Sequence, residues 1–261
     1  MKLSAVIPSW KDPYLAKTVQ SILDNADCDV EVIVVYDGYW PTVGLPDDKR
    51  VIQLHLGKNR GMRGAINAGV LVSTGDFIMR TDEHCMFAKG FGKILTEQCE
   101  PNWIVTARRY FLDPIKWEAM DLQPVEHEKL VIQEGKKFSG QPWRTRDEQQ
   151  KDVAISETMA MQGSFWIMPR KWWNEVIGEL QTEGYGPLIQ DSHEMVFKTW
   201  KAGGKLMLNK NTWFAHRHRD FGRTHQMGTK ENPANCDDGY AYALKVWKEY
   251  YDNEIRPRWK L

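Results

Sequence analysis

Apolar and polar positions over the first eighty residues follow two alternating patterns. Nearly continuous apolar runs at 3–8 and 30–38 predict buried strands, and apolar residues spaced three and four apart over 14–23 predict an amphipathic helix between them. Two further apolar runs, at 51–56 and 75–79, predict that the sheet continues. Strand, helix and strand in this order form a βαβ unit. We therefore predict an α/β fold with a mostly parallel central sheet flanked by helices.

Polar residues follow these strands where a ligand is expected. Ligands of open α/β sheets bind at the carboxyl ends of the strands, and Asp37 ends the second strand. Asp37 is therefore a candidate nucleoside contact, with a solvated turn aspartate as the alternative. The segment 59–69 is a glycine-punctuated helix start that carries Arg60 and Arg63. Such a start can present N–H groups and arginines to phosphates, although it is neither a Walker loop nor a Gly-x-Gly-x-x-Gly fingerprint.

The run after the 75–79 strand holds the most informative chemistry. Asp82 and His84 are separated by one residue in an extended segment, so both side chains point to the same side. An oxygen and an imidazole nitrogen together suit a manganese-like ion better than magnesium or calcium. Such an ion stabilises the charge on a departing nucleoside diphosphate. Alone, the pair is weak evidence, because Asp-x-His arises often by chance.

The second half of the chain supplies further segments in a recognisable order. They are Gln162–Trp173, Leu188–Trp200, Lys201–Leu206 and Trp213–Arg219. With the earlier strand ends, the 59–69 segment and the Asp82-Glu83-His84-Cys85 run, they resemble GT-A glycosyltransferases of family 2 type. The later segments resemble polypeptide N-acetylgalactosaminyltransferases most closely. The resemblance covers most of residues 1–250 and rests on the joint order of the motifs.

The resemblance implies a set of donor and metal contacts. Asp82, His84 and His216 would hold Mn²⁺ or Mg²⁺, with His218 as the rival third ligand because it faces the same side of a strand. A nucleotide-sugar donor, expected to be a UDP-sugar, would contact Pro8, Asp37, Arg63, Thr81, Asp82 and Gly163. The alternatives are a hydrogen-bonded histidine at each ligand position and a helix-surface charge at Arg63.

The helix that follows Leu188 departs from the family pattern. Leu188–Asp191 replaces a Trp-Gly-Gly-Glu stretch, which leaves the identity of the sugar open. The position of the general base in inverting family 2 enzymes falls on Ser192, which cannot deprotonate an acceptor at neutral pH. This favours retention of the anomeric configuration, whereas a shift of one residue would make Asp191 the base and reverse the conclusion. Glu194 is expected to have a packing role.

Two segments are assigned by their composition. Residues 217–235 are rich in glycine and cations and predict a mobile loop, in which Arg219, Arg223 and His225 would bring positive charge to the donor diphosphate. Together with Asp191, we take Arg219 and His225 as candidate catalytic residues. The charged stretch 108–157 is a candidate acceptor-facing insertion, with a solvated excursion as the alternative. A final amphipathic helix is expected at 240–251.

Composition favours one domain in a reducing compartment. The chain has 261 residues and 12 tryptophans, enough for a sizeable core without repeats or linkers. We divide it into a nucleotide-binding half (1–107), the insertion (108–157) and a sugar and acceptor half (158–261). We find no secretory signal and no apolar run long enough to span a membrane. Four cysteines without Cys-x-x-Cys spacing fit free thiols, so we expect a cytoplasmic bacterial or bacteriophage enzyme.

The sequence thus predicts a metal-dependent glycosyltransferase with an unassigned acceptor. The candidates, in order, are a glycan or small hydroxyl compound, a hydroxymethylated base of viral DNA, and a protein hydroxyl. The formal net charge of +0 gives no overall attraction to nucleic acid, although Arg217–Arg223 could track phosphates locally. Two other classes are a non-catalytic nucleotide-sugar-binding module and a nucleotidyltransferase. A nucleotidyltransferase would require a glycine-rich turn after the first strand, and the residues after Pro8 do not form one.

Overall fold

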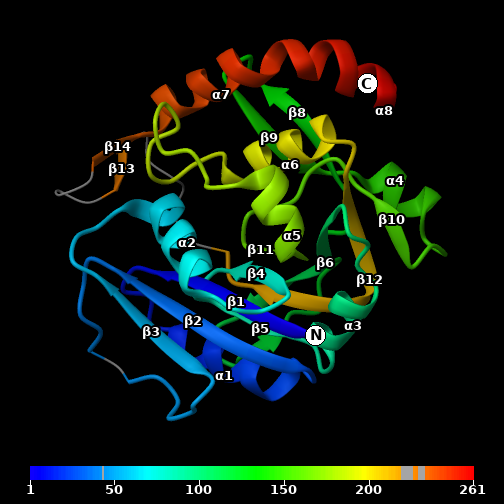
Figure 1. Cartoon of the computed structure of the whole chain (residues 1–261). Coiled ribbons are helices and arrows are strands. Elements are labelled where there is room, and N and C mark those ends of the chain that lie inside the picture. The colour runs from blue at the N-terminus through cyan, green and yellow to red at the C-terminus, as the bar shows by residue number, and fades with distance from the viewer. Residues whose placement is uncertain (43, 219–225, 229–232) are drawn as a thin grey trace.

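The fold is built on one large sheet with helices on both faces. The computed structural model describes residues 1–42, 44–218, 226–228 and 233–261. Within these residues the main sheet has ten strands, eight of them in the order β10-β12-β6-β11-β4-β1-β2-β3, while β5 pairs with β12 and β7 with β6 (Figure 1). The predicted α/β architecture is confirmed.

The N-terminal half is the parallel part of the sheet. Its elements are β1 (Lys2–Ser9), α1 (Leu15–Asn25), β2 (Asp29–Asp37), β3 (Val51–Leu56), α2 (Gly61–Val72) and β4 (Phe77–Thr81). β1 pairs in parallel with β2 and β4, and β2 pairs in parallel with β3. All four strands therefore end at the same edge of the sheet, where Ser9, Asp37 and Thr81 lie. β3 forms the border of the sheet and is half exposed, as its mixed sequence requires.

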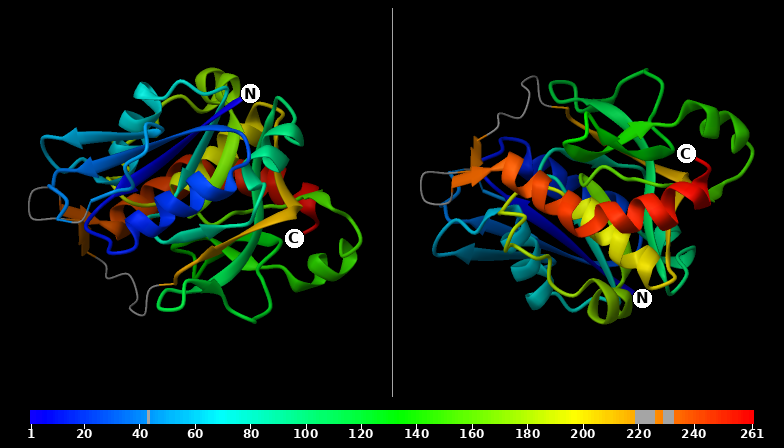
Figure 2. Two further views of the ribbon diagram at one scale, coloured as in Figure 1. Left: turned by 90° about the horizontal axis from the view of Figure 1, so that it is seen from below. Right: turned by 90° about the horizontal axis from the view of Figure 1, so that it is seen from above.

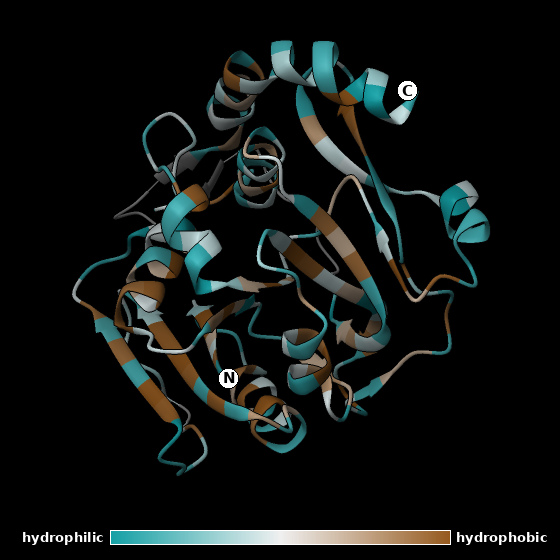
Figure 3. Cartoon of the chain, turned by 45° about the vertical axis from the view of Figure 1, so that its right-hand side comes forward, coloured by the Kyte–Doolittle hydropathy of each residue, from teal (hydrophilic) through white to brown (hydrophobic). Residues whose placement is uncertain are grey.

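Successive residues of the strands enter two different cores. In β1, Ala5 and Ile7 pack on the α1 side, whereas Val6 packs on the α2 side with Ile66 of that helix. The hydropathy colouring in Figure 3 shows how strongly apolar the central strands are. Helix α2 can lie close to the sheet because Gly69 has no side chain. A Cβ atom at this position would stand only 2.4 Å from Val6 Cγ1.

The second half of the sheet is mixed rather than parallel. Its elements are β5 (Cys85–Phe87), α3 (Phe91–Glu97), β6 (Trp103–Asp113), β7 (Glu118–Ala119), β10 (Ile155–Glu157), β11 (Phe165–Pro169), α5 (Arg170–Trp172), the π-helical turn η1 (Trp173–Ile177), α6 (Asp191–Lys201) and β12 (Lys205–His216). β11 runs antiparallel between β4 and β6, while β12 runs parallel to β6. The predominance of parallel pairing expected from the sequence therefore holds for the N-terminal half.

The charged insertion 108–157 is partly a core element. Beyond the end of β6 it forms β7, the hairpin of β8 (Glu128–Gln133) and β9 (Lys137–Pro142), helix α4 (Arg144–Gln149) and β10. Leu130 and Phe138 are fully buried, and Tyr251 Oη donates to the carbonyl of Leu130 at 2.7 Å. A freely solvated excursion is therefore excluded for the hairpin.

The C-terminal helices close this core. They are α7 (Cys236–Tyr250), the π-helical turn η2 (Tyr251–Ile255) and α8 (Arg256–Trp259). Figure 2 shows α7 running across the molecule beside α6, and the rings of Phe197 and Trp247 stack there with centroids 5.1 Å apart. In the part of the chain that the structure describes, no helix combines the length and apolar character required to cross a bilayer.

Part of the predicted loop 217–235 is a small hairpin. β13 (Gln226–Gly228) pairs antiparallel with β14 (Pro233–Asn235). Neither segment contains a β-branched or aromatic residue, so the sequence carries no strand signal there.

Candidate metal centre and donor site

The predicted metal ligands meet at the carboxyl edge of the sheet. Asp82 follows directly after β4, and His84 immediately precedes β5. His216, the last residue of β12, is brought to them because β12 pairs with β5 in a register that sets His216 opposite Cys85. This pairing joins positions that are distant in the sequence.

The three side chains converge on a common point. His216 Nε2 lies 3.1 Å from Asp82 Oδ2, and His84 Nε2 lies 3.9 Å from the same oxygen. One ligand atom from each residue lies within 4.8 Å of the others. One carboxylate oxygen and two imidazole nitrogens at this spacing fit a divalent ion of the manganese type.

A second carboxylate fixes the orientation of His84. Asp12 Oδ2 lies 2.8 Å from His84 Nδ1, and the imidazole is buried. A donated Nδ1–H leaves the lone pair on Nε2, the nitrogen that faces Asp82. Histidine ligands of metals commonly have such a carboxylate partner, which sets both tautomer and ring orientation.

Glu83 holds the loop that carries Asp12. Its buried carboxylate accepts hydrogen bonds from Ser9 Oγ and from the backbone N–H of Trp10, the latter at 2.9 Å. Burial raises the pKa of Glu83 to about 7. The residue between the two ligands thus points away from the metal centre and anchors the strand end beside it.

Asp82 and His216 are deprotonated at neutral pH. Desolvation raises the pKa of Asp82, but the nearby Arg80 charge, the His216 hydrogen bond and His84 outweigh it and hold that pKa well below its usual range. Burial lowers the pKa of His216 to about 4, although Asp82 acts in the opposite direction. Both groups are therefore in the form that binds a cation.

His218 does not join the cluster. Its ring packs against Phe111 with centroids 4.7 Å apart, and the ligand atoms that lie together are those of Asp82, His84 and His216. Of the two candidate third ligands, the geometry brings His216 into place.

Asp37 occupies the predicted strand end but has a structural task. Its Oδ2 accepts from Asn59 Nδ2 at 2.9 Å, and its Oδ1 accepts from the Arg60 backbone N–H at 2.6 Å. Burial raises its pKa. Asp37 thereby accepts a backbone N–H group just before the start of α2. The sequence had suggested that N–H groups at this helix start would bind phosphates. Pro8 lies beside Asp37, next to the end of β1 and opposite Val35.

Two predicted donor contacts are fully buried in the structure. Thr81 lies in β4 with none of its surface exposed. The guanidinium of Arg63 is also fully buried and forms an ion pair with Glu194, while Nε and Nη2 donate to the carbonyl of Ile189 at 2.9 and 2.7 Å. Arg63 therefore joins α2 to the segment before α6. Glu194 has the packing role expected of it.

Gly163 and Asp191 do come together. A Cβ atom at Gly163 would stand 3.0 Å from Asp191 Oδ2. Gly163 precedes Ser164, whose carbonyl accepts the backbone N–H of Asp82 at 3.0 Å. The predicted sugar-side residues are thus continuous with the metal loop. Three other predicted residues, Arg219, Arg223 and His225, lie outside the described residues.

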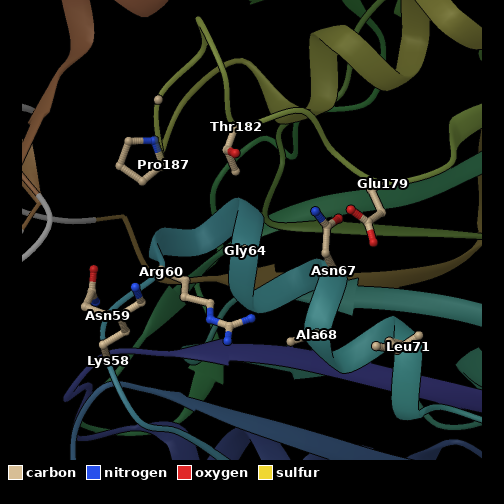
Figure 4. A pocket seen from close by; sticks show the side chains of 11 residues that line it. Lys58, Asn59, Arg60, Gly64, Asn67, Ala68, Leu71, Glu179, Thr182 and Pro187 are labelled. Atoms are coloured by element: carbon tan, nitrogen blue, oxygen red, sulfur yellow. The ribbon is translucent and has the colours of Figure 1, made fainter.

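A hollow beside the donor edge is separate from the metal centre. A cavity of about 650 Å³ lies between α2 and the segment 179–187, with Lys58, Asn59 and Arg60 at one end and Asn67 and Glu179 at the other (Figure 4). None of the three metal-ligand candidates lines it.

Comparison with known proteins identifies the family of the chain. A family model described as Glycosyl transferase family 2 matches residues 4–177. The chain belongs to this family. The predicted resemblance to family 2 is therefore confirmed. The matched range contains Asp82 and His84 but ends before Asp191 and His216.

This family 2 chain also resembles a solved structure, the crystal structure of GalNAc-T7 with UDP, GalNAc and Mn²⁺. The TM-score is 0.73 and the sequence identity 15%, over 98% of this chain and 50% of that one. The likeness confirms the GT-A fold, and our chain spans about half the length of that protein. A search of curated protein sequences gave no match.

Two residues of this candidate site escaped the sequence analysis. Asp12 lies 72 positions before His84 in a loop without a motif. Arg80 lies beside Asp82, with Nη2 2.5 Å from Oδ1. A charged residue inside the apolar strand 77–81, on the same face as Asp82, was the available signal for Arg80.

Proposed function

We propose that this glycosyltransferase moves a sugar from a UDP-sugar to a hydroxyl acceptor with the help of Mn²⁺ or Mg²⁺ held by Asp82, His84 and His216. The observation that carries the proposal is the convergence of these three side chains, with the Nε2 lone pair of His84 set by Asp12. The similar GalNAc-T7 structure is one with UDP, GalNAc and Mn²⁺, which supports the same donor class here.

The chain supplies the setting in which the ion would work. A bound divalent ion would neutralise the charge that develops on the departing diphosphate. Asp12 and Glu83 hold the metal loop, and Asp37 fixes the residues between β3 and α2 at the same edge. Predicted contacts from Arg219, Arg223 and His225 would add positive charge over the diphosphate and exclude water. Arg223→Ala would then raise donor hydrolysis relative to transfer.

We favour retention of the anomeric configuration. Ser192, at the position of the base in inverting relatives, is buried and cannot act as a base at neutral pH. Asp191 adjoins Gly163, itself a predicted donor contact, and we expect it to contact the sugar during transfer. The anomeric proton of the product, followed by NMR, tests this directly, since an inverted product would make Asp191 the general base instead.

The acceptor is assigned to the side of the metal centre that the insertion 108–157 reaches. Trp117, at the turn between β6 and β7, stacks on Tyr14 with ring centroids 6.1 Å apart. The backbone N–H of Tyr14 donates to Asp12 at 2.9 Å, so this turn borders the metal loop. A glycan or small hydroxyl compound is the first acceptor class, followed by a hydroxymethylated DNA base and then a protein hydroxyl. The cytoplasmic setting stays a prediction.

The test is donor turnover. The protein is incubated with UDP-, GDP- and dTDP-sugars, with Mn²⁺ or with chelator, and free nucleoside diphosphate is measured. We expect Mn²⁺-dependent release of UDP from one donor, lost in His84→Ala and His216→Ala. His127→Asn is the matched control. His127 lies in a second cluster of metal-ligating residue types, but its two ring nitrogens already bond Asp147 and Ser156. Equal release with chelator, or equal loss in the control, would contradict the proposal.

A further inference from the structure

Arg80 is a buried charge in the middle of the donor side. It lies in β4, two positions before Asp82, and only 2% of the residue is exposed. The strand around it is apolar, since Ile78 belongs to the α2-side core and Met79 to the α1-side core. A cation in such a strand is costly unless its N–H groups find partners.

Its partners in the chain are incomplete. Nη2 pairs with Asp82 Oδ1 at 2.5 Å and contacts Met62 Sδ at 3.1 Å. Nε and Nη1 are buried and have no hydrogen-bond partner among the described residues of the chain. Buried guanidinium groups are normally satisfied, so two unpartnered nitrogens indicate that a ligand supplies the acceptors.

Unpartnered acceptors occur on the segment that faces this region. Asp191 Oδ2 and Gln190 Oε1 are buried and likewise have no hydrogen-bond partner in the part of the chain that the structure describes. Asp191 adjoins Gly163, which leads into the Ser164 carbonyl that binds the Asp82 N–H.

The same segment is tied to the start of α2. The backbone N–H of Arg63 donates to the Pro187 carbonyl at 3.0 Å, and the Arg63 side chain donates to the carbonyl of Ile189. Arg63 follows Met62, the residue that Arg80 contacts. The segment with the unpartnered acceptors is thus linked to the surroundings of Arg80 twice, through α2 and Met62 and through Gly163 and the metal loop.

We propose that Arg80 is a specificity-determining residue that binds the donor sugar, donating to its ring hydroxyls while Asp191 and Gln190 accept from others. A neutral sugar with free hydroxyls fits, because a hydroxyl both donates and accepts. A sugar carboxylate would be repelled by the Asp191 carboxylate, because the Arg80 charge is already compensated by Asp82. This inference rests on the proposed function and deepens it by naming the sugar class and the residue that recognises it.

The experiment separates sugar recognition from nucleotide and metal binding. UDP, UDP-glucose, UDP-galactose, UDP-GlcNAc, UDP-GalNAc and UDP-glucuronate are titrated into wild type, Arg80→Lys and Arg80→Met with Mn²⁺ present. The readout is the ratio of Kd for the best-bound UDP-sugar to Kd for UDP. Arg170→Met is the matched control, since Arg170 is an arginine bonded to Ser73 at the opposite edge of the sheet.

We expect a neutral UDP-sugar to bind best to wild type. Arg80→Lys keeps a charge beside Asp82 but loses the Nε and Nη1 donors of the guanidinium. Its Kd for UDP should stay within about threefold, while the ratio rises about tenfold, the usual weight of hydrogen bonds to a charged group. Arg80→Met should raise the ratio at least as much, and Arg170→Met should leave it unchanged.

Three results would overturn the inference. An unchanged ratio in Arg80→Lys and Arg80→Met would show that Arg80 does not contact the sugar, and equal loss of UDP and UDP-sugar binding would assign it to the diphosphate or the metal. Preference of wild type for UDP-glucuronate would contradict the sugar class. In each case Mn²⁺-dependent UDP binding by wild type preserves the proposed function, whereas its absence would remove both proposals together.

Discussion

Two clusters of histidine and acidic residues in this chain have similar composition and different chemistry. Asp82, His84 and His216 form one, and Glu126, His127 and Asp147 form the other, each with ligand-type atoms within 4.8 Å of one another. In the second, His127 donates Nδ1–H to Asp147 Oδ1 at 2.9 Å and accepts from Ser156 Oγ on Nε2 at 2.7 Å. Glu126 is paired with Arg108 at 2.6 Å.

The difference lies in what the histidine nitrogens face. Both nitrogens of His127 are bonded to Asp147 and Ser156, whereas Asp12 bonds Nδ1 of His84 and directs Nε2 toward Asp82. The second cluster joins β8, α4 and β10 of the insertion. Proximity of metal-ligating residue types is therefore insufficient evidence for a metal site. The group that faces the second ring nitrogen of each histidine distinguishes the two clusters.

The largest expected effect is on Asp82. Asp82→Asn removes the negative charge that the site presents to a cation, so Mn²⁺-dependent UDP binding should weaken by more than about 100-fold. The equivalent change in the other cluster, Asp147→Asn, should leave this affinity within about threefold of wild type. Calorimetric titration with and without chelator measures both, and matching losses in the two variants would show that the clusters do not differ as described.

A smaller effect is expected when His84 loses its orienting partner. Asp12→Ala should weaken Mn²⁺ binding by about 10- to 100-fold, because the imidazole no longer holds one tautomer and orientation. Asp12→Asn keeps an acceptor oxygen for Nδ1–H and should recover part of the affinity. Free Mn²⁺ followed by electron paramagnetic resonance provides the measurement, and wild-type affinity in Asp12→Ala would contradict the assigned role.

Changes in the second cluster should alter stability and not metal binding. Ser156→Ala leaves the buried Nε2 of His127 without a partner, so the free energy of unfolding should fall by about 1–3 kcal/mol. Urea unfolding at pH 7 gives this value. A loss of Mn²⁺ affinity in the same variant would mean that the insertion and the metal centre are coupled.

The smallest effect concerns pH. Burial lowers the pKa of His127, although Asp147 acts against it. His127 of the unfolded chain therefore takes up a proton near pH 6.5, whereas His127 of the folded protein does so only at lower pH. The free energy of unfolding falls as the pH decreases from about 6.5 to the lower pKa of the folded protein. Wild type should lose more stability between pH 7 and 5 than His127→Gln does, as shown by urea unfolding at each pH. Parallel curves for the two proteins would show that His127 titrates alike in both states.

The sequence predicted the local parts of this molecule and missed the distant pairings. The βαβ unit and the Asp82–His84 pair follow from patterns within a few residues. The contact of His216 with Asp82 spans 134 positions and depends on the register between β5 and β12, so only the family resemblance suggested it. Asp12 had no motif to mark it.

Arg63 shows what a local pattern leaves out. A glycine-rich helix start with arginines resembles a phosphate site, but the ion-pair partner of Arg63 lies 131 positions later. The insertion 108–157 was opaque for a similar reason, because Phe138 becomes a core residue through contacts with Phe197 and Tyr251. Burial set by distant segments is invisible to local periodicity.

The buried pair of Arg63 and Glu194 constrains how this sequence can diverge. Each charge is fully enclosed and compensates the other, so losing either one alone costs about 3–5 kcal/mol, whereas replacing both with apolar residues of similar volume can be neutral. Substitutions at the two positions must therefore be inherited together. Among descendants of this chain, an alignment should show the two columns changing as one, a covariation that links the nucleotide half to the sugar half.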